Sequence, residues 1–343
     1  MTTAVPVSLK HWSVFFPIVT AALAAMVFAG LAGVATTKGG YPSSRFFRLS
    51  LRPPAAAIVR AVAPGAASGD MCVMALGTSG RLSVKEAVTV GLTNCDLYNN
   101  SHKAASTELV GEASLSARNI FLSGSYALSP GTLMTASGAL ATHTSPVSDP
   151  YIGLTAPGYS GCTKTRFALD AGITERTSPG VYCGGILVAG GAVLDLAPGT
   201  YILDEGNFEV GENATVMGRD VTIILTSRTR SNYGVVDFQR GATIKLSAPA
   251  SGSEVGAPGI ALWVDAMAPM ATNAIDGGGA QIIDGAVYLP SQEVSFSGGS
   301  PLGTRCSQLI ARTVSFTGDA YFRHDCAGAG ISDPIPPPRF VEE

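Results

Sequence analysis

The six cysteines of this sequence are spaced in a way that predicts disulfide bonds. They are Cys72, Cys95, Cys162, Cys183, Cys306 and Cys326. Taken in order as pairs, they are separated by 23, 21 and 20 residues. No CxxC motif occurs, so neither a thioredoxin-type redox site nor a zinc ribbon is indicated. An even number of cysteines at such spacing favours an oxidising compartment, and six free thiols in a cytosolic protein are the alternative.

The near-equal separations also predict which cysteines pair, although six cysteines allow fifteen connectivities. In a solenoid with coils of roughly 20 residues, residues one coil apart stack about 4.8 Å from each other. A disulfide needs Cα atoms about 4.4–6.8 Å apart. We therefore expect the pairs Cys72–Cys95, Cys162–Cys183 and Cys306–Cys326, each joining two adjacent coils.

Carboxylates are the next residues that could do chemistry, because parallel β-helices can host polysaccharide lyases and hydrolases. Such a site needs clustered acids with a basic residue nearby. The candidate acids are Asp204, Glu205, Asp237, Asp265, Asp276 and Asp284, with Arg240 and Lys245 as cations. They are scattered through turn segments, where Asp usually hydrogen-bonds the backbone. We therefore expect no catalytic residue.

The four histidines, His11, His102, His143 and His324, have no evident Ser or Cys partner. His324 lies close to Cys326 in the sequence, but a second pair of ligands at zinc spacing is missing. Glycine runs such as Gly277–Gly279 lack the following helix that phosphate binding requires. The sequence therefore predicts neither a metal site nor a cofactor.

Two short repeats predict the coils that would position these residues. The first is a turn residue followed by Ala, a β-branched or amide residue and an apolar residue, beginning at Gly191, Asn213, Gly241 and Gly279. Its offsets are 22, 28 and 38 residues, which we interpret as one coil, one coil with a loop insertion, and nearly two coils. The second is a Pro-Gly pair at 179–180 and 198–199, with a further copy at 130–131, where Gly fits the positive φ of a type II turn.

Short alternating segments supply the strands, for example 221–225, 260–264, 285–289 and 313–316. Helical periodicity is absent after residue 60, and residues 142–160 are expected to form a loop. Together with the repeats, this predicts an all-β, parallel β-helix over residues 68–330, which should be right-handed because crossovers between parallel strands nearly always are. A β-sandwich is the alternative, and it would show hairpin turns such as Asn-Gly, which do not occur here.

The N-terminal segment predicts attachment to a membrane. Residues 13–37 contain no charged side chain, and about 20 helical residues cross a bilayer. We expect a retained transmembrane helix within residues 1–37; a signal peptide cut near Gly33–Ala35 is the alternative.

Two features predict opposite orientations of the chain in the membrane. Lysine and arginine after the segment would keep the C-terminal side in the cytoplasm. The cysteines favour export of that side, and we prefer this orientation. We expect residues 38–67 to be a basic linker and residues 331–343 a proline-rich tail.

Composition narrows the function classes. Charged residues make up only 14% of the chain, the formal net charge is −3, and no basic stripe occurs, so nucleic-acid binding is not expected. Glycine is abundant, at 41 residues, which suits short strands joined by tight turns.

Solenoids present extended faces that suit binding. Four aromatic residues could contribute to such a face, although we expect each to pack in the core: Tyr182, Tyr201, Trp263 and Tyr288.

Several segments resemble one family. Residues 178–186 with 196–202, 284–290 with 295–298, 306–311 with 315–318, and 95–101 are similar to the C-terminal region of TadG-like proteins, which are associated with Flp-type (tight-adherence) pilus assembly. The resemblance covers roughly residues 65–326. It implies an N-terminal anchor and an exported domain linked to pilus or envelope assembly. The chain departs from the family after the anchor, where residues 36–40 read Thr-Thr-Lys-Gly-Gly instead of an acidic residue and a long helical linker.

We therefore expect a single-pass protein of the bacterial inner membrane whose solenoid is extracytoplasmic. Its expected role is structural or binding, with envelope proteins, pilus-assembly proteins or polysaccharide as partners. A carbohydrate-active β-helix is the alternative function.

Overall fold

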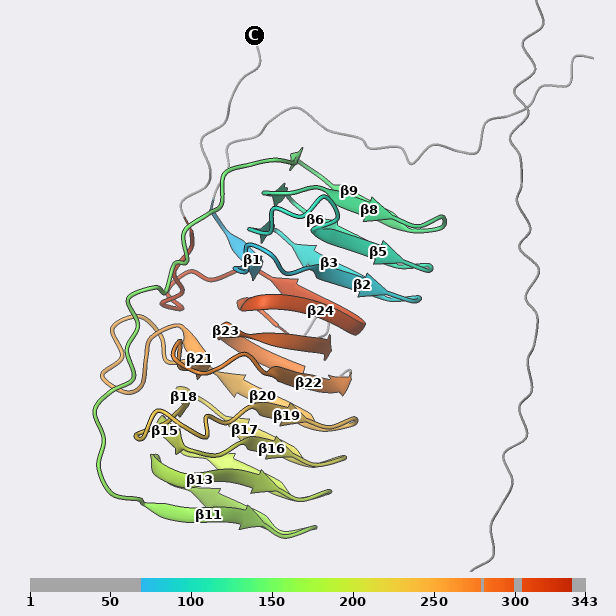
Figure 1. The fold of residues 1–343 in the computed structure, drawn as a ribbon. Helices are drawn as coiled ribbons and strands as arrows, with labels where there is room; N and C mark the ends of the chain where they lie inside the picture. The colour runs from blue at the N-terminus through green and yellow to red at the C-terminus, as the bar shows by residue number, and fades with distance from the viewer. Residues whose placement is uncertain (1–68, 279–280, 299–303, 335–343) are drawn as a thin grey trace, which may run out of the picture. The chain divides into compact units, whose positions relative to one another are not determined.

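The computed structural model describes residues 69–278, 281–298 and 304–334, and these residues form a parallel β-solenoid of about 11 turns (Figure 1). Every ladder between the named strands is parallel, and no helix occurs in the described part of the chain. The β-sandwich alternative, which requires antiparallel hairpins, is therefore wrong. The expected helix at 1–37 and the basic linker at 38–67 lie outside the described residues, as do residues 335–343 of the tail.

The strands fall into two blocks along the chain. The first block contains β1 (Met71–Ala75), β2 (Leu82–Lys85), β3 (Thr89–Thr93), β4 (Asp96–Asn99), β5 (Thr107–Val110), β6 (Ser114–Ala117), β7 (Ile120–Leu122), β8 (Tyr126–Leu128), β9 (Leu133–Ala136) and β10 (Leu140–Ala141).

The second block contains β11 (Lys164–Leu169), β12 (Thr174–Thr177), β13 (Gly180–Val188), β14 (Val193–Leu196), β15 (Gly199–Asp204), β16 (Phe208–Val210), β17 (Thr215–Gly218), β18 (Val221–Thr226), β19 (Val236–Phe238), β20 (Thr243–Ser247), β21 (Ile260–Val264), β22 (Thr272–Gly278), β23 (Gln281–Gly298) and β24 (Ser307–Arg323). The segments expected at 221–225, 260–264, 285–289 and 313–316 all lie in these strands.

The coils do not stack in the order of the sequence. The described part of the chain begins in the middle of the stack: β1 pairs with β4 on one side and with β24, the last described strand, on the other. From β1 the first block builds coils away from this point through β4, β7 and β10. The second block starts at the opposite end with β11 and builds back until β24 meets β1, β2 and β3 (Figure 1). We call this junction of β24 with β1, β2 and β3 the seam.

The core of the solenoid crosses the seam without interruption. One inward-facing column of ladder partners passes through eight coils: Ile223, Leu262, Val287, Leu309, Val73, Leu97, Ile120 and Leu140. All belong to or pack against a single apolar core. Because each coil presents apolar side chains at the same positions, the last coil of one block fits the first coil of the other as well as a sequential neighbour would.

The segment 142–163 connects the two blocks and forms a strap along the outside of the stack (Figure 1). The loop expected at 142–160 lies within it, and no strand occurs there. Val147 and Tyr151 are buried against outward-facing apolar residues such as Trp263, Tyr288 and Tyr98. This explains why strands such as β1 and β21 are buried on both faces.

The first three copies of the repeat that begins at Gly191 stack in the predicted register, but the last copy does not. Val193 lies opposite Thr215, which lies opposite Thr243, as predicted, and the long offset between the last two reflects the loop at 227–235. The last copy is displaced by one residue, since Gln281 lies opposite Ile244. β20 and β23 are direct neighbours, so the 38-residue offset is one coil with an inserted loop and not two coils.

The Pro-Gly repeat also differs from its predicted form. Gly180 and Gly199 have φ of +150° and +139°, not the +80° of a type II turn, and each is the first residue of a strand. A Cβ at Gly199 would lie 2.7 Å from the Pro179 ring, which excludes larger residues there. Only Gly131, with φ of +89° and a bond from Thr132 N to the Ser129 oxygen, follows the predicted turn.

Candidate functional site

The six cysteines form three disulfides, and these are the pairs that the spacing predicted. Cys72–Cys95 and Cys162–Cys183 have Cα–Cα distances of 5.6 Å, and Cys306–Cys326 has 4.8 Å. No described cysteine is free. Cys72–Cys95 joins the coils of β1 and β4, and Cys162–Cys183 joins those of β11 and β13. Each of these two bonds therefore links coils that are already neighbours in a ladder. Cys306 and Cys326 instead lie before and after the single strand β24, so this third pair does not join two laddered coils as predicted.

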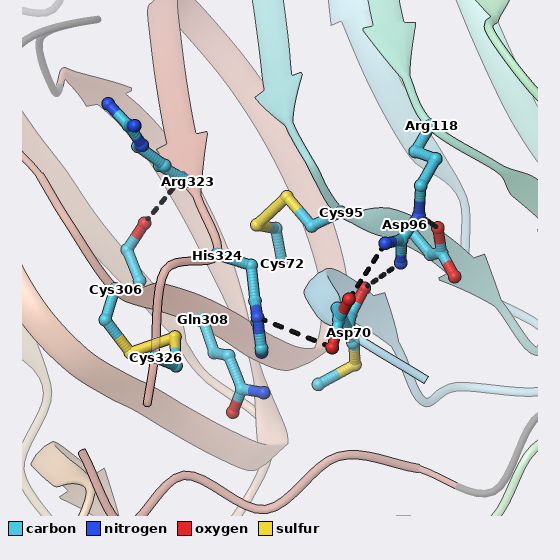
Figure 2. The surroundings of a disulfide bond; sticks show 12 residues. Asp70, Cys72, Cys95, Asp96, Arg118, Cys306, Gln308, Arg323, His324 and Cys326 are labelled. Carbon is cyan, nitrogen blue, oxygen red and sulfur yellow. Dashed lines mark hydrogen bonds and ion pairs between the residues drawn. A yellow bond between two sulfur atoms is a disulfide. The ribbon is translucent and has the colours of Figure 1, made fainter. Parts of the chain in front are cut away.

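Two of the three disulfides flank the seam (Figure 2). Cys72 lies in β1, Cys306 lies directly before β24, and Cys326 lies shortly after β24 ends at Arg323. Arg118 adds charge-assisted bonds on the β1 side, because its guanidinium contacts Asp70 at 2.8 Å and the fully buried Asp96 at 2.9 Å. Asp70 directly precedes β1, Asp96 is the first residue of β4, and Arg118 lies just before β7. Arg118 therefore links the starts of three successive coils (Figure 2).

Three of the six candidate acids share one edge of the stack. Asp204 ends β15 and lies opposite Thr226, the last residue of β18. Glu205 directly follows Asp204. Thr226 in turn donates a hydrogen bond to Asp265, directly after β21, at 2.7 Å. Two ladder steps of about 4.8 Å therefore separate the backbones at Asp204 and Asp265, and a threonine lies between them.

The partners of Asp204 show that its carboxylate is structural. It accepts hydrogen bonds from Tyr159 Oη at 2.7 Å and from the Arg228 backbone N–H at 3.0 Å, and it forms an ion pair with the Arg228 guanidinium. Burial acts to raise the pKa of Asp204, but these bonds outweigh burial and hold the pKa below its usual value. An aspartate that stays ionised in this way is a poor general acid.

The other acids are occupied or dispersed. Glu205 accepts bonds from Ser227 Oγ and from the Thr229 backbone N–H. Asp276 accepts from Ser297 Oγ. Asp284 accepts from the backbone N–H groups of Arg305 and Cys306.

The candidate cations do not complete a catalytic cluster either. The remaining candidate acid, Asp237, lies on β19, opposite Glu209 of β16. Lys245 lies on β20, in a different sheet from β15 and β21, and Arg240 lies in the turn before β20. The cation beside Asp204 is Arg228, which the sequence did not single out.

The tyrosines and the tryptophan considered for a binding face are all buried, but only Tyr182 and Tyr201 pack in the inner core as expected. Tyr182 and Tyr201 are in the core, where their hydroxyls bond backbone oxygens of Ser178 and Ala197. Trp263 and Tyr288 are on the outer side of their strands but lie beneath the strap. Burial raises the pKa of both Tyr201 and Tyr288 well above the usual tyrosine value.

A shallow groove of about 380 Å³ lies on the face formed by β12, β14, β17 and β20. Three cations line it, Arg176, Arg219 and Lys245, against one acid, Asp195. Arg176 pairs with Asp195 at 3.0 Å. In a chain of net charge −3, this groove is a local excess of positive charge whose one acid is ion-paired, and it is suited to bind an anionic group.

Comparison with known proteins gives no relative: no family model, no curated protein and no solved structure matches the chain. Within the described residues, no helix has the length and apolar character needed to cross a bilayer. The TadG-like resemblance and the membrane anchor therefore remain predictions from the sequence.

Proposed function

We propose that the protein is a non-enzymatic, membrane-anchored envelope protein whose solenoid, right-handed in its winding, is exported and serves as a scaffold or binding surface. The observation that carries the proposal is the state of the cysteines. All six form disulfides, two of which join adjacent coils, and structural disulfides are made and kept in oxidising compartments. The uncharged segment 13–37 supports an anchor, and the TadG-like segments support a link to Flp-type pilus assembly.

The candidate acids support a role without catalysis. Hydrolysis or lyase chemistry on a polysaccharide needs acids that are available to exchange protons or bind calcium. Here Asp204 is ion-paired, Glu205, Asp276 and Asp284 accept structural hydrogen bonds, and Asp265 accepts one from Thr226. The cationic groove favours binding of an anionic partner, for which an acidic envelope polysaccharide or an acidic protein segment is suitable.

Export is tested with alkaline phosphatase fused to the C-terminus of the full chain, because the phosphatase is active only where its own disulfides form. We expect an active fusion that sediments with membranes. An inactive fusion with free cysteines would contradict the proposal. The alternative, a carbohydrate-active enzyme, is tested by incubating the protein with acidic and neutral polysaccharides: new reducing ends or unsaturated products would support it, and we expect neither.

A further inference from the structure

His324 occupies a special position at the seam, directly after β24. Its side chain is only 9% exposed. Nδ1 lies 3.7 Å from Asp70 Oδ1, and Nε2 lies 3.2 Å from Asp333 Oδ2. Figure 2 shows the imidazole directed toward Asp70, beside the Cys72–Cys95 disulfide. One buried imidazole thus lies between two carboxylates from opposite ends of the described chain.

Both carboxylates are held in place through their other oxygen. Asp70 Oδ2 accepts from Arg118 at 2.8 Å. Asp333 Oδ1 accepts from the Met71 backbone N–H and from Gln308 Nε2, both at 2.9 Å. One oxygen of each carboxylate therefore faces His324 while the second is fixed by a donor. Outer partners that orient the ligating carboxylates in this way are a regular feature of metal sites.

The imidazole itself is incompletely satisfied. Nε2 of His324 is buried and makes no hydrogen bond within the described chain, although Asp333 Oδ2 is only 3.2 Å away. The contact is thus a proximity of charges without hydrogen-bond alignment.

We propose that Asp70, His324 and Asp333 bind one divalent transition-metal ion, with zinc as the best fit. Their nearest ligand atoms all lie within 4.8 Å of one another. Zinc takes imidazole nitrogen at about 2.0–2.1 Å and carboxylate oxygen at about 2.0–2.2 Å, so the side chains would have to rotate until both carboxylates reach the ion on the same imidazole nitrogen. An imidazole ligand favours zinc over calcium or magnesium, which prefer oxygen alone. Asp333 is exposed, so solvent can reach the site and water would supply the fourth ligand.

The ion would join three separate segments: the residue before β1, the end of β24 and the segment 331–334. It therefore bridges the seam, which the Cys72–Cys95 and Cys306–Cys326 bonds flank without crossing. This inference goes beyond the proposed function and does not depend on it, since it concerns how the two blocks are held together and not what the solenoid binds.

The test uses the full, disulfide-intact chain, freed of metal with EDTA and then dialysed at neutral pH. Zinc, calcium and magnesium are added separately, and the melting temperature and bound zinc per chain are measured. We expect one zinc per chain and an increase in melting temperature of roughly 5 °C at saturation, with no increase for calcium or magnesium. Cobalt added in place of zinc should give visible absorption bands of a bound site.

Matched variants locate the ion. His324→Gln and Asp333→Asn should each abolish the zinc-dependent shift and the cobalt bands, whereas His102→Gln and His143→Gln, at exposed histidines, should retain both. Asp333 is exposed, so Asp333→Asn tests the site even if the histidine variant folds poorly. A wild-type chain that binds no zinc, or variants at 324 and 333 that bind it as the wild type does, would overturn the proposal.

Discussion

Val73 of β1 lies opposite Leu309 of β24 in a parallel ladder, although one belongs to the first coil of the chain and the other to the last. Both side chains are fully buried in the common core. The chain therefore closes on itself at the seam, and the stability of the solenoid depends on a contact between coils that are made far apart in the sequence.

Leu309→Ala tests how much the seam contributes. Truncating a fully buried leucine costs about 2–5 kcal/mol, because apolar contact is lost and a cavity remains. We expect the free energy of unfolding, measured in urea, to fall by this amount. Leu133→Ala is the control, since Leu133 is 59% exposed on β9 and should change stability by less than about 0.5 kcal/mol. Equal effects of the two substitutions would show that Leu309 is not buried at a closed seam.

The strap depends on a pair of hydrogen bonds between Asn100 and Val147. The Asn100 amide donates to the Val147 oxygen and accepts from the Val147 N–H, both at 2.8 Å. Asn100→Ala leaves two buried backbone groups unpaired, at a cost of about 1–3 kcal/mol. We expect faster proteolysis within 142–160, whereas Ser145→Ala, at an exposed strap position, should be cut at the wild-type rate. Unchanged cleavage of the Asn100 variant would contradict the described attachment.

The lowered pKa of Asp204 predicts a specific dependence of stability on pH. Because the folded pKa lies below the unfolded value of about 3.9, the stabilisation is complete above that value and is lost as the pH falls through the folded pKa. Asp204→Asn should be less stable than the wild type at neutral pH and should lose less stability on acidification. Melting temperatures measured from neutral to acidic pH check this, and parallel curves for the two proteins would be the contrary result.

The Cys72–Cys95 bond predicts a measurable loss when it is removed. A cross-link closing a loop of this size stabilises by about 3 kcal/mol. We expect Cys72→Ala/Cys95→Ala to unfold at a correspondingly lower urea concentration than the wild type. Both cysteines are fully buried, so in Cys72→Ala the remaining Cys95 thiol should react with an alkylating reagent only after unfolding. A thiol at Cys95 in the untreated wild-type protein would contradict the pairing.

Spacing alone was sufficient to predict the coils and the cysteine pairs, because residues one turn apart in a solenoid must stack. It could not predict the order of the coils. Each coil presents the same apolar positions, so nothing in the local pattern distinguishes Leu309 facing Val73 from Leu309 facing the next coil of its own block. The only sequence feature related to the order of the coils was the long polar segment 142–160. It was correctly expected to be a loop, but its path could not be inferred.

The same closure explains what was missed around His324. Local spacing does not bring the proposed zinc ligands together, since the two carboxylates beside His324 come from Asp70 and Asp333. Asp70 becomes a neighbour only through the seam. The cluster of Asp204 with Arg228 was missed for a different reason: Arg228 lies in the loop inserted after β18, and an insertion carries no repeat from which its position could be predicted.

The seam itself is tested most directly by a designed disulfide. Ser83 Oγ and Ser315 Oγ lie 2.9 Å apart, and the two residues are ladder partners across the seam. Ser295 is the partner of Ser315 on the other side, so it lies two coils from Ser83, beyond the reach of a disulfide. Peptide mapping without reduction should recover an 83–315 link in Ser83→Cys/Ser315→Cys and no 83–295 link in Ser83→Cys/Ser295→Cys. Absence of the first link, or formation of the second, would show that the last coil does not stack on the first.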